Sequence, residues 1–126
     1  MSKEHIYLGI SGEEAAVNLL KENGYKILER NYRTRLGEID IIAKDKDTFV
    51  FIEVKTRHSD RLGLPAEAIS RRKQRQISKA ALTFLKENNL LDKKARFDVI
   101  SVIDSEGGPR VDLIKDAFEL EPDFMY

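Results

Sequence analysis

The sequence predicts an α/β (α+β) fold, a single domain in which helices flank one mixed β-sheet. Three observations lead to this prediction. The 126 residues match the length of one domain. No internal repeat, low-complexity tract or linker-like stretch divides the chain. Segments with helical and strand periodicity follow one another in the order αβββαββ, which packs as one sheet with helices on it.

The first expected element is a helix over "SGEEAAVNLLKENGY". Glu13 shares one face of this helix with three apolar residues, at the i, i+3, i+4, i+7 spacing. Those residues are Ala16, Val17 and Leu20. Ser11 and Glu14 have the spacing of a capping box, so we expect the helix to begin at Ser11, and Gly24 is a suitable stop.

Three strands are expected next, the second and third joined as a hairpin. They cover residues 25–33, 36–44 and 48–57. The short polar link "KDKD" joins the last two, with Lys46 and Asp47 as a two-residue turn. A loop over "HSDRLGLPAE" leads to a helix from about Pro65 to Asn89, with an apolar stripe. Strands over residues 95–104 and 111–118 complete the domain, and residues 119–126 are expected to be loosely held.

The composition excludes several classes of protein. There is no cysteine, which rules out disulfides and thiolate metal sites. No apolar run is long enough to span a membrane, and the N-terminus lacks the apolar core of a signal peptide, so we expect a cytoplasmic protein without membrane contact.

The net charge is zero but unevenly placed. Residues 55–79 hold eight basic side chains against two acidic ones, and residues 104–126 hold seven acidic against two basic. The basic stretch is either a solvated surface or a face for phosphate groups.

Charged residues interrupt the two apolar strands of the hairpin. With the turn at Lys46 and Asp47, antiparallel partners have numbers that add up to 93, so Asp40 lies opposite Glu53. The same register places Glu38 opposite Lys55, on the same face. Opposed carboxylates repel each other, and a divalent cation between them would offset the repulsion.

Oxygen ligands without cysteine or a suitable histidine favour Mg²⁺ or Mn²⁺ as the cofactor. Such a metal next to Lys55 is suited to phosphodiester hydrolysis. Glu13 would be the third carboxylate, because its helix face points toward the sheet, whereas the cap already explains Glu14. The structural alternative is a Glu38–Lys55 ion pair together with hydrogen bonds from a loop to Asp40.

The order of these motifs resembles that of the PD-(D/E)XK nuclease superfamily, and more closely the YraN-like family of uncharacterised bacterial proteins. The stretches of sequence that carry the resemblance include "SGEEAA", "GEIDIIAKD", "VFIEVKTR", "AISRRKQRQI" and "RFDVISV". The resemblance places the superfamily's acidic and lysine positions on Glu13, Asp40, Glu53 and Lys55. It implies a restriction endonuclease-like domain over residues 1–126. Ile39 stands where the superfamily's name has proline.

Two functions follow as expectations. The first is a Mg²⁺- or Mn²⁺-dependent endonuclease acting on DNA, with branched or single-stranded DNA as candidate substrates. The second is a nucleic-acid-binding module of a repair or recombination complex, without cleavage activity of its own. DNA is favoured over RNA, and the small size favours a homodimer or a partner protein. The candidate nucleic-acid-binding residues are Arg33, Arg57, Arg71, Arg72 and Lys73.

Overall fold

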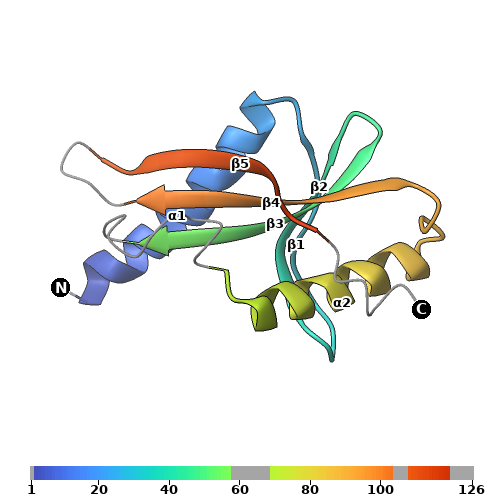
Figure 1. The fold of residues 1–126 in the computed structure, drawn as a ribbon. Helices are drawn as coiled ribbons and strands as arrows, with labels where there is room; N and C mark the ends of the chain where they lie inside the picture. Colours follow the sequence, from blue (N-terminus) through green and yellow to red (C-terminus); the bar gives the residue numbers. More distant parts are fainter. Residues whose placement is uncertain (1, 58–68, 104–107, 120–126) are drawn as a thin grey trace.

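The computed structural model describes residues 2–57, 69–103 and 108–119, with side chains from residue 12 onward. The elements are α1 (Ser2–Glu22), β1 (Lys26–Arg33), β2 (Glu38–Asp45), β3 (Thr48–Arg57), α2 (Arg71–Glu87), β4 (Lys94–Ile103) and β5 (Arg110–Phe118). They form the single small α+β domain with a mixed sheet that the sequence predicts (Figure 1). Within the described ranges, no helix combines the length and hydropathy that a membrane span needs.

The sheet has the strand order β1-β2-β3-β4-β5. Neighbouring strands are antiparallel except β3 and β4, which are parallel. A parallel pair needs a crossover connection, and α2 lies in the segment that provides it. The crossover places α2 against the sheet near β2.

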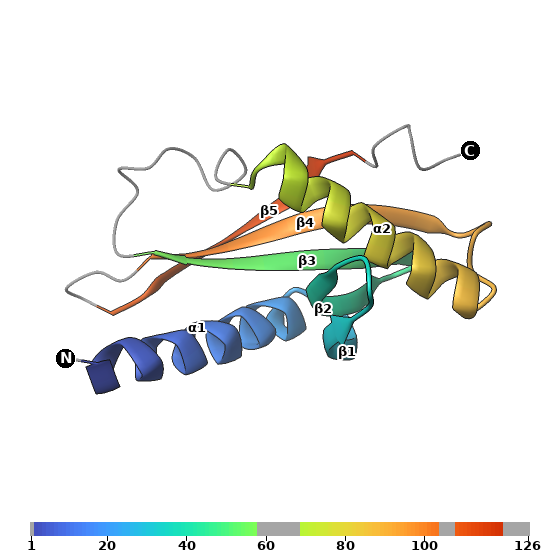
Figure 2. The ribbon, with the colours of Figure 1, turned by 90° about the horizontal axis from the view of Figure 1, so that it is seen from below.

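The two helices cover opposite faces of the sheet (Figure 2). Alternate residues of the central strands enter two separate cores, because successive side chains of a strand point to opposite faces. Phe51 packs in the core under α2, and Val50 and Ile52 pack in the core under α1. The apolar stripe predicted for the second helix is confirmed by burial of Ile69, Ile77, Ala80, Ala81, Phe84 and Leu85.

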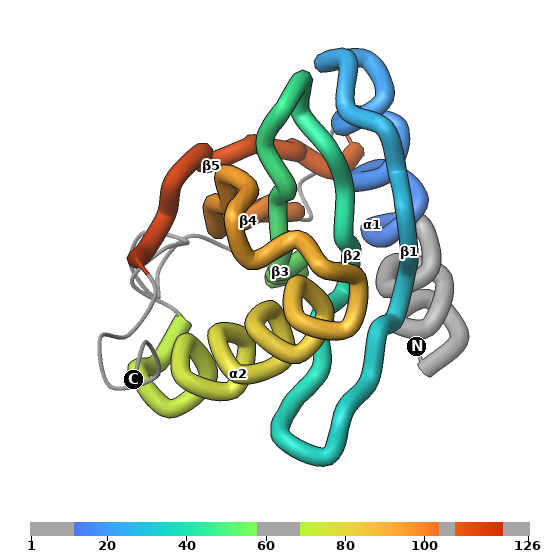
Figure 3. Tube along the Cα trace, turned by 90° about the vertical axis from the view of Figure 1, so that its right-hand side faces the viewer, coloured from blue at the N-terminus to red at the C-terminus, as the bar shows by residue number. Residues whose placement is uncertain are grey.

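The β2–β3 hairpin has the predicted register. Its pairs run from Asp45–Thr48 to Ile41–Ile52, with Lys46 in a positive-φ turn conformation (φ 57°). Beyond Ile41 the ladder to β3 ends, while β2 continues to pair with β1. Figure 3 shows this parting of the strands, where β1 and β2 continue together as β3 turns away.

The early end of the ladder corrects one prediction. Glu38 does not lie opposite Lys55 in the sheet. It pairs with Arg33 of β1 instead, and its Oε2 lies 3.4 Å from Arg33 Nε. The register alone could not show this, because the twist of the sheet and the packing of β1 decide where two strands separate.

Both helix starts also differ from the predictions. The first helix begins at Ser2, so Ser11 lies inside it and not at its N-cap position. The i, i+4 spacing of Ile6 and Ile10 continues the helical pattern upstream, and the capping-box spacing is coincidental.

The second helix begins at Arg71 rather than near Pro65. Ser70 has extended backbone (φ −62°, ψ 158°), and its Oγ accepts a hydrogen bond from the backbone N–H of Lys73 at 3.1 Å. This is an N-cap, which satisfies one of the free N–H groups of the first turn. The predicted loosely held tail lies almost wholly outside the described residues, which end at Glu119.

Candidate active site

Asp40 and Glu53 meet where β2 and β3 part. The backbone N–H of Val54 donates to Asp40 Oδ2 at 2.8 Å, so a side chain takes over where the backbone ladder has ended. The two carboxyl groups are also within hydrogen-bonding reach of each other. The hairpin register predicts this meeting, even though the strands themselves no longer pair there.

The surroundings of this pair favour protonation. Burial, followed by the negative charge of Asp40, raises the pKa of Glu53 to about 7. Burial likewise raises the pKa of Asp40, although the hydrogen bond from Val54 opposes the rise. Only 11% of the Glu53 side chain is exposed. Near neutral pH the pair therefore carries charge that water does not adequately solvate.

Two lysines act on the pair. Lys73 Nζ lies 3.7 Å from Glu53 Oε1, and its charge lowers the pKa of both Asp40 and Glu53. Lys55 is partly buried on β3, and its charge also lowers the pKa of Glu53. The cap at Ser70 fixes the first turn of α2, and this turn carries Lys73 toward the sheet.

Glu13 stands beside the pair rather than within it. It lies on α1, where its Oε1 is 3.3 Å from Arg30 Nη2 and accepts a 3.5 Å hydrogen bond from Asn31. Its charge nevertheless raises the pKa of Asp40. In the part of the chain that the structure describes, no three His, Cys, Asp or Glu residues form a group able to hold a metal ion. The structure thus brings two of the three predicted carboxylates together.

The predicted nucleic-acid-binding residues divide into two groups. Arg71 and Arg72 are exposed at the start of α2, and Arg33 is exposed at the end of β1. Arg57 is only 8% exposed, and other groups of the protein engage it. It occupies the central strand opposite Ile103 of β4, where a side chain is covered rather than presented to a ligand.

The donor set of the pair fits a hard divalent cation. Both groups supply carboxylate oxygens, which Mg²⁺ and Mn²⁺ prefer. Among the described residues, the cation in contact with the pair is Lys73, at 3.7 Å from Glu53. A cation of higher charge would stabilise both carboxylates in their ionised form.

Comparison with known proteins places the chain in a family. Residues 12–102 match the model described as "Uncharacterised protein family UPF0102". The chain belongs to UPF0102. A UPF0102 protein of Geobacter metallireducens is 54% identical over 120 residues, covering 95% of this chain and 98% of that protein. One from Syntrophus aciditrophicus is 52% identical over 117 residues, with coverage of 93% and 92%.

A more distant UPF0102 protein, from Desulforapulum autotrophicum, is 44% identical over 121 residues and is covered completely. The stretch matched by the UPF0102 model contains the carboxylate pair, Glu13, Lys55 and Lys73. The whole candidate site therefore lies inside the family's common region. The YraN-like resemblance of the sequence is confirmed at the level of this family.

Sequence reasoning missed the contact between Lys73 and Glu53. It treated Lys73 as a residue for phosphate contact, whereas the structure makes it a counter-charge of the pair. Ser70, followed three residues later by Lys73, was the available signal, because an N-cap at Ser70 fixes which first-turn side chains face the sheet.

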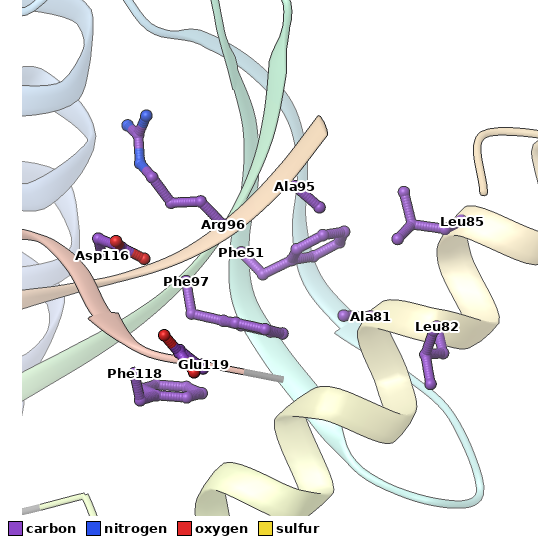
Figure 4. A pocket seen from close by; sticks show the side chains of 10 residues that line it. All are labelled: Phe51, Ala81, Leu82, Leu85, Ala95, Arg96, Phe97, Asp116, Phe118 and Glu119. Atoms are coloured by element: carbon purple, nitrogen blue, oxygen red, sulfur yellow. The ribbon is translucent and has the colours of Figure 1, made fainter. Parts of the chain in front are cut away.

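An apolar pocket lies apart from the carboxylate pair. It has a volume of ≈200 Å³ between α2 and the β4–β5 side of the sheet. Figure 4 shows Phe51, Phe97 and Phe118 pointing into it, with Leu82 and Leu85 from α2 on the opposite side. Its aromatic lining continues the core under α2, and it contains no group of the candidate site.

Proposed function

We propose that this protein is a metal-dependent nuclease that hydrolyses phosphodiester bonds in DNA. The observation that carries the proposal is the partly buried Asp40–Glu53 pair, with raised pKa values and too little positive charge beside it. Purely structural carboxylates are paired with cations or hydrogen-bond donors, because burying uncompensated charge costs free energy. Carboxyl groups whose pKa values are raised in this way are typical of functional sites.

Each residue of the site has a role in this proposal. Asp40 and Glu53 would hold Mg²⁺ or Mn²⁺, and the ion would supply Lewis-acid stabilisation of a phosphate oxygen and a water of lowered pKa. Val54 orients Asp40 through the backbone hydrogen bond. Lys55, on the same strand as Glu53, would stabilise negative charge that develops on the phosphate. Glu13 is the third carboxylate beside the pair.

The resemblance to the PD-(D/E)XK superfamily supports this function and the assignment of a restriction endonuclease-like fold, both of which are part of the proposal. The element order and the position of the carboxylates at the parting of β2 and β3 are consistent with it. We include DNA as the partner and, because the domain is small, a homodimer or a partner protein for cuts on two strands.

Binding without independent cleavage is the second candidate. The observation in its favour is that Glu13 is held by Arg30 and Asn31, so that two carboxylates rather than three meet in the described residues. In that case, the protein would use Arg71, Arg72 and Arg33 to bind phosphates and would depend on a partner to complete the site.

The test is cleavage of labelled linear, nicked, flap and four-way DNA with Mg²⁺, Mn²⁺ or EDTA. We expect cleavage only with metal, and its loss in Asp40→Asn, Glu53→Gln and Lys55→Met. Asp112→Asn is the matched control, because that carboxylate pairs with Arg110 on the exposed β5. Metal titration followed by calorimetry gives an independent readout. Metal binding without cleavage on every DNA would favour the second candidate, and no metal binding would contradict both the nuclease and its metal site.

A further inference from the structure

The four-residue loop between β1 and β2, residues 34–37, is held rigidly by its own hydrogen bonds. Thr34 Oγ1 accepts from the backbone N–H groups of Leu36 and Gly37, each at 3.1 Å, and donates to Gly37 O at 2.9 Å. The backbone N–H of Thr34 also donates to Gly37 O at 2.8 Å. One threonine side chain therefore fixes the loop, and residues on its outer side are displayed in a constant position.

The loop is also seated against α2. A Cβ atom built on Gly37 would lie 2.5 Å from the backbone oxygen of Gln76, which leaves no room for any side chain at this position. Gln76 lies one turn after Lys73, the residue that reaches Glu53. The loop, the first turns of α2 and the carboxylate pair thus form one continuous structure.

The outer side of the loop carries an unusual combination of residues. Leu36 is 54% exposed, one of three large hydrophobic side chains that are exposed among the described residues. Arg35 directly precedes it and Arg33 lies three residues before it, and both are exposed. Arg33 is bound to Glu38, whereas no ion pair to Arg35 is found in the described part of the chain. An exposed leucine next to an exposed arginine that has no acidic partner among the described residues fits a polyanion with an apolar interior, such as stacked nucleic acid.

An open groove of ≈580 Å³ lies between this loop and α2. Residues 32–36 line one side, and Thr83 and Glu87 line the other. Tyr32 Oη donates to Glu87 Oε2 at 3.4 Å, which engages the acidic residue of the groove. Its volume is within the range of sites for small ligands, so a single nucleobase fits.

The distance to the carboxylate pair suits a nucleic acid. Leu36 precedes Asp40 by four residues, so their Cα atoms lie at most roughly 13 Å apart at about 3.3 Å per residue. Along one strand of DNA this corresponds to at most about four steps of 3.4 Å. A DNA strand passing over the pair would therefore reach the loop a few nucleotides away.

We propose that this loop is a wedge for DNA with an interrupted base stack. Leu36 inserts at a branch, flap or nick, Arg35 binds the adjoining phosphate, and the groove receives the displaced base. Apolar side chains are known to act as such wedges between base steps. Separating stacked bases costs free energy, and the cost is least where stacking is already interrupted, so the wedge selects branched over continuous DNA. The inference rests on the proposed function for its nucleic-acid partner and adds the substrate class.

The test compares Leu36→Ala with the native loop, both in the Asp40→Asn background so that no DNA is cut. Binding is measured to continuous, flap and four-way DNA, with 2-aminopurine next to the junction as a fluorescent reporter of unstacking. We expect Leu36→Ala to weaken binding to interrupted DNA by about tenfold, the scale of burying one leucine. Continuous duplex should be bound almost equally by both. With Leu36→Ala, the change in 2-aminopurine fluorescence that reports unstacking should be absent.

Two further variants sharpen the test. Leu91→Ala is the matched control, since Leu91 is 59% exposed in the turn after α2, and it should change nothing. Arg35→Ala should lower the slope of log affinity against log salt by about one. Circular dichroism verifies that each variant is folded.

The outcomes separate this inference from the proposed nuclease. Equal losses on continuous and interrupted DNA, no loss on either, or no DNA binding at all would each overturn the wedge. If the native protein cleaves DNA but Leu36→Ala binds and unstacks each DNA as the native loop does, the proposed nuclease is supported and the wedge is contradicted. If unstacking depends on Leu36 but the native protein never cleaves, the wedge stands and the proposed catalysis fails.

Discussion

Two carboxylate clusters in the same sheet are built in opposite ways. Asp98 of β4 is fully buried and accepts hydrogen bonds from Tyr25 Oη, Arg96 Nε and the backbone N–H of Asp116, each at 2.9 Å. Arg96 also binds Asp45 at 2.9 Å. Apart from each other, Asp40 and Glu53 have one backbone donor and one lysine, at 3.7 Å, among the residues that the structure describes.

The difference separates a structural cluster from the pair that we propose as a functional site. Both oxygens of Asp98 accept hydrogen bonds, and these link β4 to β5 and to Tyr25, which directly precedes β1. The Asp40–Glu53 pair lies where strands part and contributes repulsion instead. Buried charge that is fully compensated holds a fold together, whereas charge that lacks compensation marks a candidate site for a ligand.

The largest effect is expected at the structural cluster. Asp98→Ala leaves Arg96 and Tyr25 without their central acceptor, and breaking a buried pair in this way costs about 3–5 kcal/mol. Urea denaturation measures the free energy of unfolding. Asp112→Ala, which removes the exposed partner of Arg110, is the control and should cost less than about 1 kcal/mol. If both variants lost a similarly small free energy of unfolding, Asp98 would not be a structural residue of the kind described above.

The second prediction concerns the pH dependence of stability. Folded Glu53 keeps its proton up to about pH 7, whereas in the unfolded chain it loses it near its ordinary value of 4.5. Between these values the folded state binds more protons, so its stability falls as pH rises, by up to about 1.4 kcal/mol per pH unit. Glu53→Gln should flatten this slope in denaturation curves from pH 4.5 to 7. An unchanged slope in the variant would show that Glu53 has an ordinary pKa.

The smallest effect is expected for Asp40→Asn. The amide oxygen can still accept from Val54, and repulsion with Glu53 disappears, so the variant in EDTA should match wild type or exceed it by about 0.5–2 kcal/mol. Mn²⁺ should stabilise it less than wild type, because stabilisation follows metal binding to the native state.

Asp40→Ala is the companion variant. It leaves the N–H of Val54 without its acceptor and should cost about 1–3 kcal/mol. The melting temperatures of wild type, Asp40→Asn and Asp40→Ala are measured in EDTA and with Mn²⁺. A clear drop for Asp40→Asn in EDTA, together with no difference in the response to Mn²⁺, would make Asp40 a structural residue like Asp98.

The local part of this architecture could be predicted from the sequence. A two-residue turn and alternating apolar residues fix the hairpin register, and this is why Asp40 and Glu53 were placed together.

The remaining features depend on tertiary packing. The end of the β2–β3 ladder, the contact of Lys73 with Glu53 and the burial of Arg57 are set by elements far apart in the chain. No periodicity within one segment contains that information. The capping box at Ser11 failed for a related reason, since a short motif cannot show that a helix continues on both sides of it.

The parallel pairing of β3 with β4 has a consequence during synthesis of the chain. Thr48 pairs with Lys94 and Arg57 with Ile103, so each partner arrives 46 residues later. Chains are synthesised at about 5–20 residues per second, so the apolar edge of β3 stays unpaired for seconds after the β2–β3 hairpin has emerged. Such an edge invites association with other nascent chains. Glu53 and Lys55 interrupt its apolar run, so the charges proposed for chemistry also protect the unfinished protein from aggregation.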